Sequence, residues 1–216
     1  MNALTDKKEK NKAKPVAGII LAAGSSRRMG RLKQMLPFQG KSLLAHTIEK
    51  GLAADLSPLI LVLGHKADQI KERISKYPID VIINPIFSDG MASSICTGLN
   101  HLTAIRKDSD TPSGAVFLLA DQPLVTVETI QTISEKGRTC PGKIIIPVMD
   151  GRRGNPVYFD NCFFTAMTHL EGDIGGRALF TRFAHAVEEL PVTDPGIFLD
   201  IDTPKAYEQL CQKEEK

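Results

Sequence analysis

Residues 16–33 decide the fold, and they read Val-Ala-Gly-Ile-Ile-Leu-Ala-Ala-Gly-Ser-Ser-Arg-Arg-Met-Gly-Arg-Leu-Lys. The first part of this stretch, residues 16–21, is an apolar run without alternation, which is typical of a strand buried on both faces of a parallel sheet. The second part is a loop with two glycines and two serines, and four cations fall within its last seven residues, 27–33. A strand that ends in such a loop indicates an α/β domain, because open α/β sheets bind ligands beyond the carboxyl ends of their strands.

The rest of the chain repeats this alternation of apolar runs and helical patterns. Further strands are predicted at 59–63, 80–83, 115–120, 143–148, 187–190 and 197–201. Helices are predicted at 42–54, 67–75, 92–105 and 126–136, and a last helix follows residue 203. Alternating strands and helices favour a parallel sheet that is covered by helices. We therefore predict a single α/β domain with three layers, α/β/α, around a Rossmann-like, mostly parallel sheet.

The positive charge of the chain is concentrated at its amino terminus. Of the 216 residues, 27 are Lys or Arg and 25 are Asp or Glu, which gives a net charge of +2. Residues 1–14 hold five lysines and two acids, so this tail carries +3 and residues 15–216 carry −1. We predict a disordered basic tail over 1–14 and one folded domain over 15–216. A folded body without a net basic charge argues against nucleic-acid binding.

The amino-terminal segment also imitates a secretory signal, because lysines precede an apolar run that ends in Ala22-Ala23. Similar apolar runs recur along the chain, so a buried first strand is the preferred interpretation. No run is long enough to span a membrane. The four cysteines are widely spaced and form no Cys-x-x-Cys pair, a pattern typical of free thiols inside the cell. These features predict a cytoplasmic protein without a membrane partner.

The loop after the first strand has the composition of a phosphate cradle. Gly24 and Gly30 allow the backbone to approach a ligand closely, and the small residues leave amide N–H groups accessible. The cations at 27, 28, 31 and 33 suit a polyanion, and no carboxylate lies among them. The loop is neither a Walker A motif nor a Gly-x-Gly-x-x-Gly motif. Phosphate binding is the preferred interpretation, and a solvated basic loop is the alternative.

Carboxylate motifs follow two other predicted strands. Asp121 ends the apolar run 115–120, and a following Gln-Pro fixes the turn. Asp200 and Asp202 share one face of the predicted strand 197–201, just before a Thr-Pro that opens the last helix. Mg²⁺ takes one or two carboxylates and completes its octahedron with water and substrate phosphate. Asp121 and Asp202 are therefore candidate Mg²⁺ ligands, and helix capping is the alternative for Asp202.

Six motifs occur in a fixed order: LAAGSSRRMG…K, NPIFSDGMASS, LADQPLV, RRGNPVYF, GDIGGR and DIDTP. Together, from about residue 16 to residue 207, they resemble the MobA-like nucleotidyltransferase family, and within it the molybdenum cofactor cytidylyltransferases. The resemblance implies a sheet of the nucleotide-diphospho-sugar transferase type. It also implies Mg²⁺-dependent transfer of CMP from CTP to the terminal phosphate of molybdopterin. Guanylyltransferases of the family carry LAGG in place of LAAG and lack the Asp-Gln-Pro form, so the resemblance implies cytosine.

The resemblance also implies roles for individual positions. The CTP phosphates would lie on the first loop, at Leu21, Ala22, Ala23, Gly24, Ser25, Arg28 and Lys33. The base and ribose would lie against Asn84, Gly90, Ser93 and Ser94. Molybdopterin would face Gly172, Asp173, Gly175, Gly176 and Arg177. Arg28, Lys33 and Asp121 would be catalytic, with Mg²⁺ on Asp121 and Asp202. Helix capping is the alternative for Ser93 and Ser94, and a plain turn for 172–177.

The implied reaction needs no side-chain base, because a phosphate monoester is already largely dianionic at pH 7, with a second pKa of about 6. Catalysis then consists of alignment and charge neutralisation. Two other functions remain open. One is nucleotidyl transfer to a different phosphorylated acceptor, such as a sugar or alcohol phosphate. The other is a maturation or insertion factor for a molybdenum hydroxylase such as xanthine dehydrogenase in purine catabolism, a role that some relatives serve.

Overall fold

The computed structural model describes residues 14–26, 29–105, 111–173 and 175–212, so the predicted tail over 1–14 lies almost wholly outside these ranges. Its strands are β1 (Val16–Ala22), β2 (Pro37–Phe38), β3 (Lys41–Ser42), β4 (Leu59–Leu63), β5 (Asp80–Ile83), β6 (Gly114–Leu119), β7 (Ile144–Met149), β8 (Arg152–Arg153), β9 (Val157–Asp160) and β10 (Val187–Pro191). Its α-helices are α1 (Leu43–Ala53), α2 (Ala67–Ile74), α3 (Met91–Ala104), α4 (Val127–Thr139), α5 (Phe164–Met167), α6 (Arg177–Arg182) and α7 (Pro204–Gln212).

The main sheet has the order β10-β7-β9-β6-β1-β4-β5, and β8 pairs with β7 at the side. The pairs β1–β4, β1–β6, β4–β5 and β7–β10 are parallel. Within this sheet, β9 and the short β8 run antiparallel to the strands with which they pair. The predicted mostly parallel sheet is confirmed, and so is the buried first strand, since five of the seven residues of β1 are buried in a row at its start.

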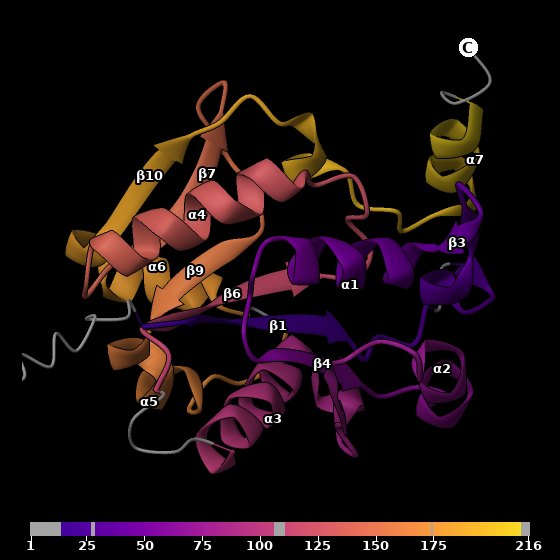
Figure 1. Cartoon of the computed structure of the whole chain (residues 1–216), viewed down its shortest axis with the longest axis horizontal. Coiled ribbons are helices and arrows are strands. Elements are labelled where there is room, and N and C mark those ends of the chain that lie inside the picture. Colours follow the sequence, from indigo (N-terminus) through magenta and orange to yellow (C-terminus); the bar gives the residue numbers. More distant parts are fainter. Residues whose placement is uncertain (1–13, 27–28, 106–110, 174, 213–216) are drawn as a thin grey trace, which may run out of the picture.

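Helices cover both faces of the sheet, so the predicted three layers are confirmed. Figure 1 shows α1 and α4 above one face and α3 and α5 below the other. Side chains of β1 alternate between these layers: Ile20 joins the core under α1 and α4, and Ile19 joins the core against α3. The local start signals are also present, because Ser42 caps α1 and Thr126 caps α4 with their side-chain oxygens.

The predicted strand over 197–201 is wrong. Residues Pro195–Phe198 form a 3-10 helix, η6, and the residues that follow are irregular. The Asp194 side chain accepts a hydrogen bond from the Gly196 backbone at 2.8 Å, and Pro195 stands at the first helical position. Both features start a helical turn rather than a strand. Asp200 and Asp202 therefore lie in a loop and not on one face of a strand.

A third, smaller hydrophobic core holds the loop with Asp200 and Asp202 against the loop that follows β1. Met29, Leu36 and Phe38 of the first loop pack with Ile201 and with Leu210 of α7. The Tyr207 hydroxyl on α7 donates a hydrogen bond to the Pro37 carbonyl oxygen. The segment around residue 202 is thus fixed against the loop that follows β1, although the two are far apart in the sequence.

The described helices are all too short or too polar to cross a lipid bilayer. All four cysteines lie in the described ranges and are free thiols, as predicted.

Asp194 supports the turn that carries Asp121. Its Oδ2 atom accepts hydrogen bonds from the Thr126 backbone at 2.8 Å and from the Thr126 and Thr129 hydroxyls at 3.0 and 2.8 Å. Burial acts to raise the pKa of Asp194, but these donors and the Gly196 backbone N–H lower it below its usual value. A carboxylate with a lowered pKa stabilises the fold above its unfolded pKa, and this contribution is lost as the pH falls through the folded pKa.

We expect Asp194→Ala to lower the free energy of unfolding by about 3 kcal/mol at pH 7, because several donors lose a charged acceptor. Urea unfolding measures this loss. The difference from wild type should shrink below about pH 4, because the unfolded chain takes up the proton there and the folded carboxylate takes it up only at lower pH. Glu189→Ala is the matched control, because the Glu189 side chain is exposed and forms an exposed ion pair with Arg153. A loss in Asp194→Ala no larger than in this control would contradict the assignment.

Candidate active site

The carboxyl ends of β1, β4, β5 and β6 meet at one edge of the sheet, because these strands are parallel. The loop after β1 begins at this edge. Gly64, just after β4, lies so close to this loop that a Cβ atom would stand 2.7 Å from the Ala23 carbonyl oxygen. The two backbones can approach only because Gly64 has no side chain.

Gln34 fixes the shape of the loop after β1. It is buried, and its Nε2 atom donates to the carbonyl oxygens of Ala22 at 3.0 Å and Gly24 at 3.1 Å. Its Oε1 atom accepts from the Ser26 hydroxyl at 3.1 Å. These bonds turn the two carbonyls inward, toward the protein. Because a trans peptide group is planar, the N–H groups of Ala23 and Ser25 point away from Gln34.

Lys33 lies between two carboxylates. Its Nζ atom is 2.6 Å from Asp121 Oδ2 and 2.5 Å from Asp202 Oδ1. Asp121 follows β6, and Asp202 is held by the third core. Burial acts to lower the pKa of Lys33, but the two carboxylates outweigh it and raise this pKa above its ordinary value. Lys33 is therefore an ammonium ion at neutral pH, and it balances two carboxylates at the sheet edge.

The donor chemistry of this cluster suits a divalent cation. Two carboxylates that converge on one ammonium provide the one or two protein ligands that Mg²⁺ needs. The described residues contain no cluster of three or more His, Cys, Asp or Glu that could hold a metal by themselves. A metal at Asp121 and Asp202 would therefore take its remaining ligands from water and from substrate.

Asn84 lies at the end of β5 and is fully buried. Its Nδ2 atom donates to the hydroxyls of Ser93 at 2.8 Å and Ser94 at 3.0 Å. The Ser93 hydroxyl in turn donates to the carbonyl oxygens of Gly90 and Ile86. The predicted alternative that these serines cap the helix is wrong, because Gly90 occupies the N-cap position of α3 and both hydroxyls accept from Asn84 instead.

Most of the residues predicted to hold a nucleotide line one cavity of about 530 Å³ at the sheet edge. From the first loop it includes Leu21, Ala22, Ala23, Gly24, Ser25, Lys33 and Gln34. From the other side it includes Phe87, Ser88, Gly90, Met91 and Ser94. Asp121, Asp202 and Asp173 complete the lining. Asn84 and Ser93 are not part of this lining, and they support it from behind.

The loop over 172–176 covers the start of α3. Asp173 Oδ1 accepts a hydrogen bond from the Met91 backbone at 3.1 Å, and the Gly172 carbonyl accepts one from Ala92 at 3.0 Å. Gly172 and Gly175 both have positive φ, 67° and 59°, which glycine adopts without strain. This loop is thereby attached to the segment that follows β5. The predicted nucleotide and acceptor residues thus lie side by side.

A second cavity of about 270 Å³ adjoins the first. It shares Leu21, Met91, Leu119, Asp121, Asp173 and Asp202 with the first cavity. Its floor is apolar and aromatic, from Ile95, Phe117, Val157, Phe159, Met167 and Phe180. The predicted acceptor residues Gly175, Gly176 and Arg177 line it, together with Asn155 and Asp200. Gly172 is not in the lining. The two cavities therefore meet at the Asp121–Asp202 pair.

Asp200 stands at the second cavity, held by Gln122. The Gln122 Nε2 atom donates to Asp200 Oδ1 at 2.7 Å, and Gln122 itself is buried. Partial enclosure and then the negative charge of Asp121 raise the pKa of Asp200. Sequence reasoning placed Asp200 near Asp202 but gave it no role, and it missed Gln34, Gln122 and the aromatic floor.

Arg28 and Arg27 lie outside the described residues, and so does Ile174. The predicted role of Arg28 therefore has no structural counterpart here. Of the other cations of the loop, Arg31 lies over the Tyr207 ring, with 5.7 Å between its guanidinium carbon and the ring centroid. Lys33 is thus the described cation of this loop that lies between the carboxylates.

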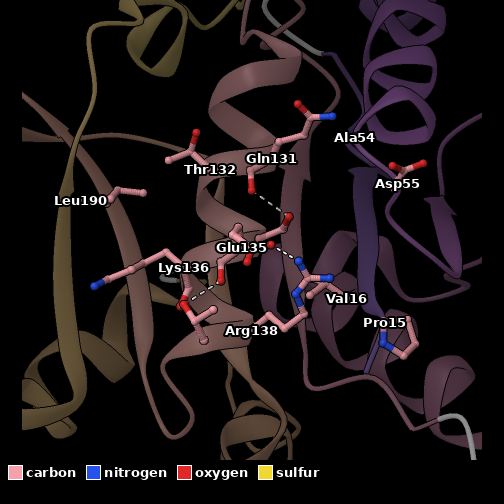
Figure 2. Close-up of a pocket in the computed structure, with 12 residues that line it drawn as sticks. Pro15, Val16, Ala54, Asp55, Gln131, Thr132, Glu135, Lys136, Arg138 and Leu190 are labelled. Carbon is pink, nitrogen blue, oxygen red and sulfur yellow. Dashed lines mark hydrogen bonds and ion pairs between the residues drawn. The ribbon is translucent and has the colours of Figure 1, made fainter. Parts of the chain in front are cut away.

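A further hollow of about 660 Å³ lies along α4, near the first residues of β1 (Figure 2). Its wall includes Glu135 and Lys136, and their charges are already paired, with Arg138 and Glu188 respectively. None of the predicted site residues lines it. The chemistry of the molecule is therefore assigned to the sheet edge, where a partly buried ion cluster and two cavities coincide.

Comparison with known proteins agrees with this geometry. Residues 18–211 match the family model of the MobA-like NTP transferase domain. Over 192 residues the chain is 29% identical to the molybdenum cofactor cytidylyltransferase of Escherichia coli, covering 88% of this chain and 92% of that protein. It is 29% identical to the purine catabolism protein PucB of Bacillus subtilis, over 89% of this chain and 94% of that protein. It is 28% identical to nicotine blue oxidoreductase of Paenarthrobacter nicotinovorans, over 87% of this chain and 92% of that protein.

Among solved structures, Rv0371c of Mycobacterium tuberculosis, in a complex with manganese, superposes with a TM-score of 0.77 at 28% identity, covering 92% of this chain and 99% of that one. The match of the family model spans nearly all of the described chain, and the cavities and carboxylates lie within it. The chain therefore belongs to the MobA-like NTP transferase family and is a nucleotidyltransferase.

Proposed function

We propose that this protein is a molybdenum cofactor cytidylyltransferase, which transfers CMP from CTP to the terminal phosphate of molybdopterin and releases pyrophosphate. One observation carries the proposal. A polar cavity built on a glycine-rich loop and a smaller aromatic cavity meet at the Asp121–Lys33–Asp202 cluster. This arrangement suits two substrates whose phosphates react at the junction.

The larger cavity is assigned to CTP. Ala22–Ser25 line it, and Gln34 holds the carbonyls of Ala22 and Gly24, so the N–H groups of Ala23 and Ser25 point away from Gln34. Amide N–H groups and the Lys33 ammonium suit the triphosphate. Gly90 and Ser94 line the part of the cavity beside Phe87, where the base and ribose would lie. Asn84 and Ser93 act by holding this wall, and Arg28 is assigned to the phosphates by family resemblance.

Asp121 and Asp202 are assigned to Mg²⁺. When bound, this ion would neutralise the charge that develops on the transferring phosphoryl group. In the reaction, an oxygen of the acceptor phosphate forms a bond to the α-phosphorus of CTP. The bond from that phosphorus to the oxygen bridging the β-phosphorus breaks, and pyrophosphate leaves with the electron pair. Lys33 would orient the phosphates, and no side chain has to remove a proton.

The smaller cavity is assigned to molybdopterin. Its aromatic floor suits a flat ring, and Arg177 at the start of α6 offers a cation to the phosphate. Gly175 and Gly176 let the loop approach the ligand closely, and Asp173 attaches this loop to the nucleotide side.

Two alternatives share the same cavities. A nucleotidyltransferase for another phosphorylated acceptor would use the same ion cluster with a different ring or alcohol in the smaller cavity. A maturation or insertion factor for a molybdenum hydroxylase would bind cofactor with little turnover, a role consistent with the likeness to a purine catabolism protein.

The deciding experiment measures pyrophosphate release by the full chain with molybdopterin, Mg²⁺ and each of the four NTPs. We expect turnover with CTP and at least tenfold less with GTP, about the discrimination that matched and mismatched hydrogen bonds provide. Turnover with GTP but not CTP would overturn the base assignment. Cofactor binding without turnover would favour the insertion factor, and turnover only with other phosphorylated acceptors would favour the first alternative.

Gln34→Leu is expected to raise the KM for CTP about tenfold with a smaller change in kcat. The variant keeps the size of the side chain but releases the carbonyls of Ala22 and Gly24, so the loop amides lose their fixed direction. Steady-state kinetics with varied CTP measure this effect. Gln131→Leu is the control, because Gln131 is exposed on α4 and donates only to the Ala53 carbonyl. An unchanged KM in Gln34→Leu would contradict the role of Gln34.

A further inference from the structure

The smaller cavity joins an aromatic floor to a carboxylate. The Phe117 and Phe159 rings meet edge to face with centroids 5.6 Å apart, and Phe159 stacks on Phe180 at 6.1 Å. The cavity volume of about 270 Å³ lies just below the range of about 300–1,000 Å³ that is usual for sites of drug-sized ligands. It therefore suits one small flat ring system rather than a whole nucleotide.

Four carboxylates line this cavity, and three of them have other partners. Asp121 and Asp202 bind the Lys33 ammonium, and Asp173 accepts from the Met91 backbone. Asp200 accepts from Gln122 through Oδ1 only, and its Oδ2 atom has no hydrogen-bond donor within the described part of the chain. A carboxylate has about four acceptor positions, so Asp200 keeps most of its capacity for a ligand.

Gln122 sets the position of this carboxylate. It is 4% exposed, and its Nε2 atom also reaches the Ile197 carbonyl at 3.3 Å. The Ile201 backbone donates to the Asp121 carbonyl at 2.9 Å, so the segment around Asp200 is fixed at both ends. Gln122 Oε1 is buried and has no hydrogen-bond partner among the described residues, which makes this amide a poor choice for stability alone. A positioning role explains why a polar side chain stands there.

We propose that Asp200 selects the ring of the acceptor, and that Gln122 is the residue that positions Asp200. The preferred ligand is a flat heteroaromatic ring with a ring N–H beside an exocyclic amino group. Such a pair of N–H donors matches the two oxygens of a carboxylate, while the phenylalanines contact the ring. This inference rests on the proposed function, because it assigns acceptor recognition within that same site.

Equilibrium binding of free pterin and of lumazine tests the proposal. Lumazine carries an oxygen in place of the exocyclic amino group of pterin, so the pair isolates that donor. Ligand fluorescence is titrated with the full chain, without nucleotide or metal, so the result does not depend on turnover. We expect wild type to bind pterin at least about tenfold more tightly than lumazine, and Asp200→Asn to bind both within about twofold.

Gln122→Met separates positioning from stability. This variant removes the donor to Asp200 together with the unpartnered oxygen, so we expect thermal stability to be retained while the preference for pterin falls about threefold or more. A merely structural role of Gln122 would leave the pterin-to-lumazine ratio unchanged. Glu189→Gln removes one exposed carboxylate on β10 and should keep the wild-type ratio.

The outcomes separate this inference from the proposed function. A wild-type preference for pterin that disappears in Asp200→Asn supports the inference, even if no NTP is turned over. An unchanged ratio in Asp200→Asn overturns it, even if CMP transfer to molybdopterin occurs. Failure of wild type to bind pterin at millimolar concentration, or equal binding of both rings by wild type, also overturns it.

Discussion

Replacing Asp121 with asparagine is expected to lower the rate of pyrophosphate release by about a thousandfold, while the protein remains folded. The substitution keeps the shape of the side chain but removes one of the two negative charges that converge on Lys33. The Asp121 backbone carbonyl still accepts from Ile201, so the attachment of the 197–202 segment is preserved. The expected loss therefore comes from the missing charge and not from unfolding.

Two measurements check this expectation. Stopped assays of pyrophosphate give the rate, and titration of Mn²⁺ by electron paramagnetic resonance gives metal affinity, which should fall at least about tenfold. Asp68→Asn is the matched control, because Asp68 is exposed in the first turn of α2. Near-normal rate and Mn²⁺ affinity in Asp121→Asn would exclude Asp121 as a metal ligand.

The strands of the sheet could be predicted because a strand that is buried on both faces is a continuous apolar run in the sequence. The run 59–63 is apolar throughout, and every residue of β4 is buried. The run 197–201 is also rich in apolar residues, yet Ile197 and Ile201 are buried by loop packing around a 3-10 turn. Hydrophobicity reports burial, and it does not report which backbone conformation achieves it.

The position of the antiparallel strand β9 within the sheet could not be predicted from the sequence either. The dipeptide Asp150-Gly151 is typical of a turn, but no pattern in the sequence places β9 between β6 and β7. This insertion brings Asn155 and Val157 to the same edge as Asp121, where they line the smaller cavity. The aromatic floor follows from it, because Phe159 on β9 then meets Phe117 on β6.

The motifs of the site could be found in the sequence, but their partners could not. Lys33 stands 88 and 169 residues from the carboxylates that it binds, and no spacing rule connects them. Gln34 looks like a surface residue by type, although the apolar residues Leu32, Met35 and Leu36 around it were a signal that this segment is buried. Gln122 was noted only as part of a motif, because its contact with Asp200 depends on the loop that was predicted as a strand.

Lys33→Met is expected to separate metal binding from catalysis. The Lys33 ammonium lies within 2.6 Å of an oxygen of each candidate metal ligand, so a divalent cation competes with it for the same two carboxylates. Removing the ammonium should raise the affinity for Mn²⁺ in the absence of nucleotide about tenfold. The rate of CMP transfer should nevertheless fall about a hundredfold or more, because the triphosphate loses a cation that orients it.

The same substitution should weaken the effect of the nucleotide on metal affinity. In wild type, the CTP phosphates would attract Lys33 away from Asp121 and Asp202, so nucleotide and metal are expected to strengthen each other's binding. In Lys33→Met this coupling should decrease, which Mn²⁺ titrations with and without CTP measure. Lys33→Arg keeps the charge and should keep the lower metal affinity of wild type, and Lys71→Met on the exposed side of α2 should change nothing. A fall in Mn²⁺ affinity in Lys33→Met would mean that the carboxylates converge only because Lys33 holds them, and the competition would be excluded.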